Sequence, residues 1–263
     1  MSGTGAIRAS LGDGLLRLTL SRPDRMNTID FDFAADLNEG VDLAMDPSVR
    51  VLLIDAEGPA FCAGGDLARF ERFFAEPGAG EIARLLTSLH AAIARLALLD
   101  IPVVAAVQGV AAGAGLSLVA ACDIVVASSS ARFTLAYTKA GLTLDGASTY
   151  FLPRIIGLRR ATELALTNRV LTATEALEWG LITAVVDADE LPERALRTAL
   201  DLRDGATGAL GATKRLLRTS AGATLTDQLG AEEAAMIARF STADAAEGIH
   251  AFIERRAPKF TGD

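Results

Sequence analysis

The chain has few of the side chains on which many enzymes depend. Its 263 residues include two cysteines, two histidines, two tyrosines and one tryptophan. Cys62 and Cys122 lie far apart, so they match neither a disulfide framework nor the paired spacing of a metal site. Because free cysteine usually acts as a small buried hydrophobe, we expect that role for both, no metal site, and a reducing, cytoplasmic setting.

An excess of positive charge is also missing. The 25 Lys and Arg residues face 33 Asp and Glu, for a net charge of -8. A surface with this balance does not attract nucleic acid or anionic membranes, although a few local arginines can still hold a small anion. The first ten residues, MSGTGAIRAS, contain no long apolar segment, so we expect no secretory signal.

One segment tests whether the chain enters a membrane. Between residues 101 and 131 the only charged side chain is Asp123, and GVAAG within it has the small-residue spacing of packed membrane helices. A membrane helix at 101–127 is therefore one alternative. Because Pro102 and several glycines interrupt the run, we expect a strand, a glycine loop, a buried helix and a second strand instead.

The first two thirds of the chain alternate between two hydrophobic periods. Period-2 or continuous apolar runs indicate strands, and apolar residues at helical spacing indicate helices. The order of these elements predicts an α/β fold with a mainly parallel sheet covered by helices. The expected strands are 14–23, 49–58, 102–109 and 122–128, and the expected helices are 31–45 and 81–99.

After about residue 155 the pattern becomes helical. Thr172 and Glu175 form a capping-box sequence, and Gly180 ends the helix that it begins. We predict a core domain at 1–195 and a helical region at 196–263. The last helices either cover the same core or pack on a neighbouring subunit. They are expected at 189–204, 207–219, 224–240 and 243–256.

Two glycine-rich segments follow strand-like runs: GPAFCAGGDL and QGVAAGAGLSL. Glycine lets backbone N–H groups approach a ligand, and two such loops together can hold one oxyanion. Other motifs are incomplete, since Leu118 replaces the third glycine of a dinucleotide fingerprint and Val119 the last glycine of a hydrolase elbow. We expect His90 and His250 to be surface or core-edge residues.

Asp145 is a solitary carboxylate in the stretch AGLTLDGASTYFLP. The nearest acidic residues are Asp123 and Glu163. One interpretation is a turn or helix cap, because aspartate commonly fills that position. The other is a catalytic base.

These loops, together with AYTKAGLTLDGASTYFLPRIIGLRRATELALTNRVLTATEALEWGLI, resemble the crotonase, or enoyl-CoA hydratase/isomerase, superfamily. The resemblance extends from SRPDRMNTID to FIERRAPKF. It implies a spiral of β-β-α units followed by C-terminal helices that form a trimer or a dimer of trimers. It also implies an acyl-CoA thioester substrate and no separate cofactor, because coenzyme A is part of the substrate.

The resemblance also assigns roles to particular residues. The backbone amides of Gly65 and Ala114 match the two donors that hold the thioester oxygen, with alanine where the family usually has glycine. Ser117 and Tyr137 stand where the family's hydratases have two glutamates, so ordinary hydration is not expected. The remaining Asp145 matches the aspartate of family isomerases, including the ring-epoxide isomerase of phenylacetyl-CoA breakdown.

We therefore expect an acyl-CoA isomerase with Asp145 as the base and Gly65 and Ala114 as the oxyanion donors. The alternatives are a hydratase that places water by other groups, a thioester hydrolase, and an acyl-CoA binder without catalysis. By the same resemblance the substrate-binding residues are Arg22, Arg25, Met26, Ala63, Asp66, Tyr137, Leu142, Arg255 and Lys259. For the arginines, the simpler interpretation is a solvated surface residue.

Overall fold

Two mainly parallel sheets organise the computed structural model, which describes residues 5–74 and 79–263. The larger sheet has the strand order β1-β2-β3-β5-β7-β10, and the smaller has the order β4-β6-β8-β9. The larger sheet contains β1 (Ile7–Gly12), β2 (Leu15–Leu20), β3 (Val51–Ala56), β5 (Val103–Val107), β7 (Ile124–Ser128) and β10 (Ala184–Val186). The smaller contains β4 (Ala60–Cys62), β6 (Val110–Ala112), β8 (Arg132–Thr134) and β9 (Leu171–Thr172).

The sheets alternate along the chain. β3, β5 and β7 of the large sheet are each followed by a short strand of the small sheet, β4, β6 and β8, and then by helices. This repeat is the predicted spiral of β-β-α units. Within it, β2, β3, β5, β7 and β10 run parallel, as do β4, β6 and β8.

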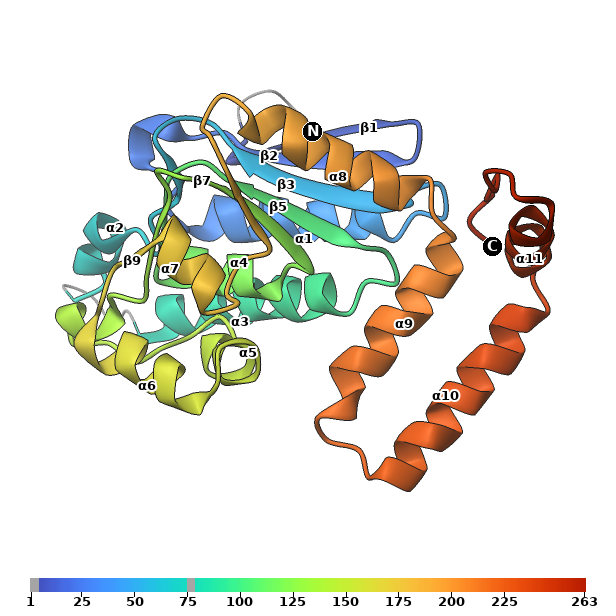
Figure 1. The fold of residues 1–263 in the computed structure, drawn as a ribbon. Helices are drawn as coiled ribbons and strands as arrows, with labels where there is room; N and C mark the ends of the chain where they lie inside the picture. Colours follow the sequence, from blue (N-terminus) through green and yellow to red (C-terminus); the bar gives the residue numbers. More distant parts are fainter. Residues whose placement is uncertain (1–4, 75–78) are drawn as a thin grey trace.

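The large sheet is buried on both faces. Along β3, Leu52 and Ile54 belong to the main hydrophobic core, while Val51 and Leu53 belong to a second cluster on the other face. This explains why the strand reads as a continuous apolar run rather than an alternating one. Figure 1 shows α8 (Leu191–Arg203) on one face and α1 (Phe31–Ala44), α3 (Ala79–Ala97) and α4 (Ala114–Ala121) on the other.

The segment 101–127 does not form one long helix. It contains β5, β6, the eight-residue α4 and β7, which confirms the predicted strand, loop, helix and strand. The glycine loop differs in one detail, because Val110–Ala112 forms the short strand β6. Among the helices of the described residues, none is long and apolar enough to cross a membrane. The interpretation of 101–127 as a membrane helix is therefore wrong.

The chain ends in three helices that project from the body (Figure 1). α9 (Thr207–Ser220) and α10 (Leu225–Phe240) form a hairpin, and α11 (Ala243–Glu254) follows. The division at residue 195 stays a prediction, and that position lies within α8, which packs on the sheet through Leu191, Ala195 and Ala199. The other helices are α2 (Leu67–Arg72), α5 (Ser148–Ile155), α6 (Leu158–Thr167) and α7 (Ala173–Glu178), with single turns η1 (Pro23–Arg25) and η2 (Tyr137–Ala140).

Candidate active site

The two glycine loops lie against each other. They follow β4 and β6, which pair in parallel, and parallel strands bring their carboxyl ends to the same sheet edge. Gly64 and Gly113 have φ of 90° and 52°, a region that favours glycine. A Cβ built on Gly64 would lie 2.9 Å from the Ala112 carbonyl oxygen and 3.5 Å from Gly113 Cα. The approach of the loops therefore requires glycine there.

The Gly65 amide points away from Ile29, the residue with which Gly65 forms an isolated parallel bridge. Gly64 O accepts a hydrogen bond from Ile29 N at 2.8 Å, and Asp66 N donates one to Ile29 O at 3.0 Å. In such a parallel bridge the residue between, Gly65, directs its own N–H to the opposite side. A Cβ on Gly65 would lie 2.7 Å from the Phe70 ring, so the ring closes over this residue.

Ala114 is the first residue of α4. An N–H in the first turn of a helix has no partner within the helix and lies at the positive end of its dipole. Across residues 5–74 and 79–263, no acceptor binds the amide of Gly65 or of Ala114. The position of α4 that lies closest to the neighbouring backbone is Gly115, where a Cβ would lie 2.2 Å from Cys62 O. An alanine at position 114 therefore keeps the N–H donor without a clash.

Asp145 lies beside α4 and is held by Tyr137. The Tyr137 hydroxyl donates a hydrogen bond to Asp145 Oδ1 and lies 3.4 Å from Ser117 Oγ. Ser117 is on α4, one turn after Ala114, and Tyr137 Cζ lies 3.8 Å from a Cβ built on Gly113. These contacts place the carboxylate next to the two glycine loops.

The carboxylate of Asp145 does not cap a helix. The cap residue of α5 is Ala147, and no side chain bonds its first turn. The main chain of Asp145 does contribute, since its carbonyl accepts from Ser148 N at 3.1 Å and Ser148 Oγ at 2.9 Å. The interpretation of the side chain as a simple cap is therefore wrong.

Tyr137 is fixed as a hydrogen-bond donor. Burial, the negative charge of Asp145 and the hydrogen bond between them raise the pKa of the phenol above its usual 10. The hydroxyl therefore stays protonated at neutral pH. We predicted Tyr137 as a substrate contact, and the structure directs its hydroxyl to Asp145.

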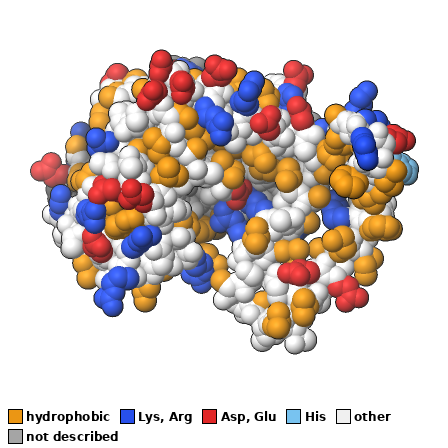
Figure 2. Space-filling model, viewed as in Figure 1, with side chains coloured by type: hydrophobic (Ala, Val, Ile, Leu, Met, Phe, Trp, Pro, Cys, Tyr) orange, Lys and Arg blue, Asp and Glu red, His pale blue; other side chains and the backbone are white. Residues whose placement is uncertain are grey.

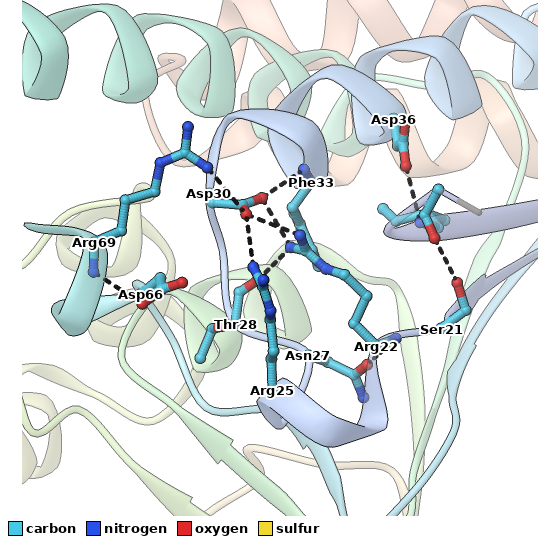
Figure 3. A network of polar contacts seen from close by, with 12 residues as sticks. Ser21, Arg22, Arg25, Asn27, Thr28, Asp30, Phe33, Asp36, Asp66 and Arg69 are labelled. Carbon is cyan, nitrogen blue, oxygen red and sulfur yellow. Dashed lines mark hydrogen bonds and ion pairs between the residues drawn. The ribbon is translucent and has the colours of Figure 1, made fainter.

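The arginines of the RPDRMN turn gather around a buried carboxylate that the sequence did not reveal. In Figure 3, Arg22, Arg25 and Arg69 converge on Asp30, whose side chain is 1% exposed. Arg22 binds it through both terminal nitrogens at 2.8 Å, while Arg69 and Arg25 lie at 3.5 and 3.9 Å. Burial opposes ionisation, but the Arg22 and Phe33 hydrogen bonds win and lower the pKa of Asp30.

Besides the two arginines, three further predicted contacts, Met26, Ala63 and Asp66, lie around this cluster. Ala63 N donates to Met26 O at 3.0 Å, which joins the RPDRMN turn to the first glycine loop. Asp66 caps α2 by accepting from Arg69 N at 3.1 Å. The side chains of Arg25 and Arg69 remain 61% and 38% exposed.

The other predicted contacts lie elsewhere. Leu142 follows η2 and is 43% exposed. Arg255 ends α11, and Lys259 N donates to Glu247 Oε1 at 2.7 Å. α11 lies at the end of the molecule opposite α2 (Figure 1), so the chain does not bring Arg255 and Lys259 to Asp145.

Both cysteine thiols are buried. Burial raises the pKa of Cys62, which ends β4 beside the first glycine loop, to about 12. The thiol therefore stays protonated and is no nucleophile. Within the described part of the chain, no group of three or more His, Cys, Asp or Glu side chains is placed to hold a metal ion.

Comparisons with known proteins agree with this architecture. Residues 11–263 match the family model described as enoyl-CoA hydratase/isomerase. The chain is 39% identical to the 1,2-epoxyphenylacetyl-CoA isomerase of Escherichia coli over 253 residues, 95% of each chain. It is 32% identical to the trans-2-decenoyl-[acyl-carrier-protein] isomerase of Streptococcus mutans, over 96% of this chain and 97% of the relative.

A solved structure shares the fold. The crystal structure of an enoyl-CoA hydratase from Polaromonas superposes with a TM-score of 0.93 at 35% identity, covering 97% of this chain and 100% of the other. The family model spans nearly the whole chain and the relatives exceed 30% identity. The protein therefore belongs to the enoyl-CoA hydratase/isomerase family, also called the crotonase superfamily.

Proposed function

We propose that the protein is an acyl-CoA isomerase in which Asp145 is the base. The observation that carries this proposal is the Asp145 carboxylate, held by Tyr137 next to the loops that bear two amides to which no acceptor binds among the described residues. A double-bond shift needs one base that takes a proton and returns it elsewhere. Hydration in this family uses two glutamates, and the matching positions here hold Ser117 and Tyr137.

The reaction divides between base and oxyanion site. The carboxylate of Asp145 removes a proton from the carbon next to the thioester carbonyl, and the electron pair moves onto the carbonyl oxygen. The N–H groups of Gly65 and Ala114 hold that oxygen, each contributing about 3–4 kcal/mol of transition-state stabilisation. Asp145 then returns the proton at the far end of the dienolate, which moves the double bond into conjugation.

Coenzyme A enters as part of the substrate, and the proposal includes no separate cofactor. Arg22 donates two hydrogen bonds to Asp30, so its guanidinium group stabilises the RPDRMN turn and is not available to bind a phosphate. Arg25 and Arg69 keep exposed guanidinium groups beside the same carboxylate. Arg25 and Arg69 are therefore the guanidinium groups that the phosphates of coenzyme A can reach.

The relatives support isomerisation without restricting it to one thioester. Two of them carry isomerase names, one for an aromatic ring epoxide and one for a decenoyl chain. The Polaromonas structure carries a hydratase name. A hydratase, a hydrolase and a non-catalytic binder therefore remain the alternatives that product analysis has to separate.

The test follows a 3-enoyl-CoA in deuterated water by conjugated-thioester absorbance and product mass. We expect conjugation to grow without the added mass of water, and Asp145→Asn to lower the rate by about 1,000-fold or more, as expected when a positioned base is lost. Asp189→Asn, an exposed position before α8, is the matched control. Added water mass, released coenzyme A, or full activity of Asp145→Asn would contradict the proposal.

We also propose a trimer or a dimer of trimers in a reducing, cytoplasmic setting. The apolar side chains exposed on α9–α11 support the assembly, and the two buried, unpaired thiols support the setting. In such an assembly, Arg255 and Lys259 meet the coenzyme A of a neighbouring subunit rather than their own.

A further inference from the structure

One peptide group next to the proposed base is held at both of its ends. The carbonyl oxygen of Asp145 accepts from Ser117 Oγ at 3.1 Å and from Ser148 Oγ at 2.9 Å. The N–H of the same peptide group belongs to Gly146, and it donates to His90 Nε2 at 3.2 Å. His90 is exposed on α3, fifty-six positions earlier in the chain.

This peptide group belongs to the turn that carries the Asp145 side chain. Gly146 and Ala147 both have left-handed backbones, with φ of 59° and 62°, so the turn is an uncommon conformation that its contacts must maintain. A Cβ on Gly146 would lie 2.7 Å from Ser117 Cβ, which shows how closely the turn lies on α4. Loss of the contacts at either end of this peptide group would let the turn, and the Asp145 side chain that it carries, shift relative to α4.

The contact also fixes the chemical form of His90. A backbone N–H can only donate, so Nε2 must present its lone pair, and the neutral ring then carries its proton on Nδ1. A protonated ring would set two N–H groups against each other. Ser117 and Ser148 bind only the carbonyl oxygen of this peptide group. The side chain that binds its N–H is that of His90.

We propose that His90 is a positioning residue that holds the Asp145 turn by accepting the Gly146 N–H. Its effect on turnover rests on the function proposed above, whereas its hydrogen bond does not. His90 touches the turn and not the reacting atoms, so it acts through Asp145.

The first experiment needs no substrate. Nitrogen-15 shifts of the two histidines are recorded at pH 8, with His250→Leu used to assign them, together with hydrogen exchange of the Gly146 amide. We expect His90 to carry its proton on Nδ1, unlike exposed His250, and Gly146 exchange to accelerate about tenfold in His90→Leu, as expected for one lost hydrogen bond. A proton on Nε2, or unchanged exchange, would overturn the proposal.

The second experiment measures turnover of the 3-enoyl-CoA. We expect His90→Leu to lower kcat about tenfold with KM changed by less than about twofold, because the base is misplaced while binding is kept. His90→Gln should restore most of kcat, since its side-chain oxygen accepts the same N–H, and His250→Leu should match wild type. Equal losses in the Leu and Gln variants, or none in His90→Leu, would refute the positioning role.

The two experiments separate the two proposals. If the wild type converts no 3-enoyl-CoA while His90 shows the Nδ1 proton and Gly146 its protection, the isomerase proposal fails and the hydrogen bond stands. If conversion occurs and His90→Leu keeps both kcat and Gly146 protection, the isomerase proposal stands and the positioning role fails.

Discussion

Tyr137 is the residue on which the geometry of the proposed base depends most directly. Its hydroxyl donates a hydrogen bond to the carboxylate of Asp145, which is the base in the proposed reaction. Position 137 therefore supplies a donor that orients the acceptor at position 145. Ser117 supports the same arrangement, because it offers a small hydroxyl against which the Asp145 turn packs.

Replacing Tyr137 by phenylalanine tests this role. The ring remains and the hydrogen bond to Oδ1 is lost, and a bond to a charged group contributes about 1.5–3 kcal/mol. We expect Tyr137→Phe to lower kcat for the 3-enoyl-CoA by about 10- to 100-fold with a smaller change in KM. Unchanged kcat would show that Asp145 is oriented without the phenol.

The raised pKa of Tyr137 adds an expectation for pH. Because burial and the Asp145 charge raise that pKa above 10, the phenol is still protonated where an ordinary tyrosine begins to ionise. Wild-type kcat should therefore show no decline due to Tyr137 between about pH 8 and pH 10. A pH profile of kcat measures this, and a basic limb that disappears in Tyr137→Phe would contradict it.

At the scale of elements, the Asp30 cluster joins three segments that border the first glycine loop. Asp30 caps α1 through Phe33 N, Arg22 precedes η1, and Arg69 belongs to α2. The buried carboxylate therefore fixes how the RPDRMN turn and α2 meet. Removing one partner of a buried pair costs more than the pair contributes, because the other charge is left in the interior.

We expect Arg22→Met to destabilise the fold by about 3 kcal/mol, as in other broken buried pairs. Arg25→Met, at 3.9 Å from Asp30 and exposed, should cost less than about 1 kcal/mol. The pKa of Asp30 is lowered below its usual 3.8, so the unfolded chain binds the proton more readily than the folded one. The stabilisation is therefore present above pH 3.8 and is lost as pH falls below that value.

Urea unfolding of wild type and both variants at several pH values measures these differences. The difference in free energy of unfolding between wild type and Arg22→Met should decrease as the solution is acidified below the usual pKa of aspartate, about 4. A gap that stays constant with pH, or equal losses in the two variants, would mean that Asp30 does not carry the stabilisation.

Most elements were predicted from local patterns, because their ends are set by local chemistry. The Thr172–Glu175 capping box is present at the start of α7, and Thr224 caps α10 as its sequence position suggests. The short strands β4, β6, β8 and β9 of the small sheet were not predicted, and neither was β1, although Asp13 and Gly14 form the tight turn that joins β1 to β2. An Asp-Gly pair between two strand-like runs was the available signal.

The candidate site was predicted only where a motif marks a residue. Gly65, Ala114 and Asp145 stand within recognisable segments, but their partners do not. His90 reaches Gly146 across fifty-six positions, and its helix shows an ordinary amphipathic pattern. In the sequence, Asp30 has the position of an ordinary helix cap. The arginines that surround it lie both before it and after it in the chain (Figure 3). Such contacts arise from tertiary packing, which periodicity does not encode.

At the scale of the whole molecule, ion pairs attach the first helix of the C-terminal hairpin to the body. Asp123, just after α4, pairs with Lys214 at 2.7 Å and Arg218 at 2.9 Å, both on α9. Lys214 is largely buried, and this burial lowers the pKa of its ammonium group despite the Asp123 charge. The contact fixes α9 on the body, while α10 lies beyond it (Figure 1).

The projecting helices expose apolar stripes. Figure 2 shows hydrophobic side chains along them and a hollow between them and the body. Aliphatic and aromatic residues from α9, α10 and α11 are between 47% and 85% exposed, which is uncommon for a chain that stays alone. They are Leu217, Leu225, Leu229, Met236, Ile237, Phe240, Ile249, Phe252 and Ile253.

The proposed assembly follows from covering these stripes with further copies of the chain. We expect light scattering after size exclusion to give three or six times the 27.4 kDa of one chain. Met236→Glu, which places a charge in the middle of the α10 stripe, should shift the mass toward one chain. Leu166→Glu on α6, where the side chain is similarly exposed at 70%, should leave it unchanged. A monomeric wild type would leave the stripes without this partner and contradict the assembly.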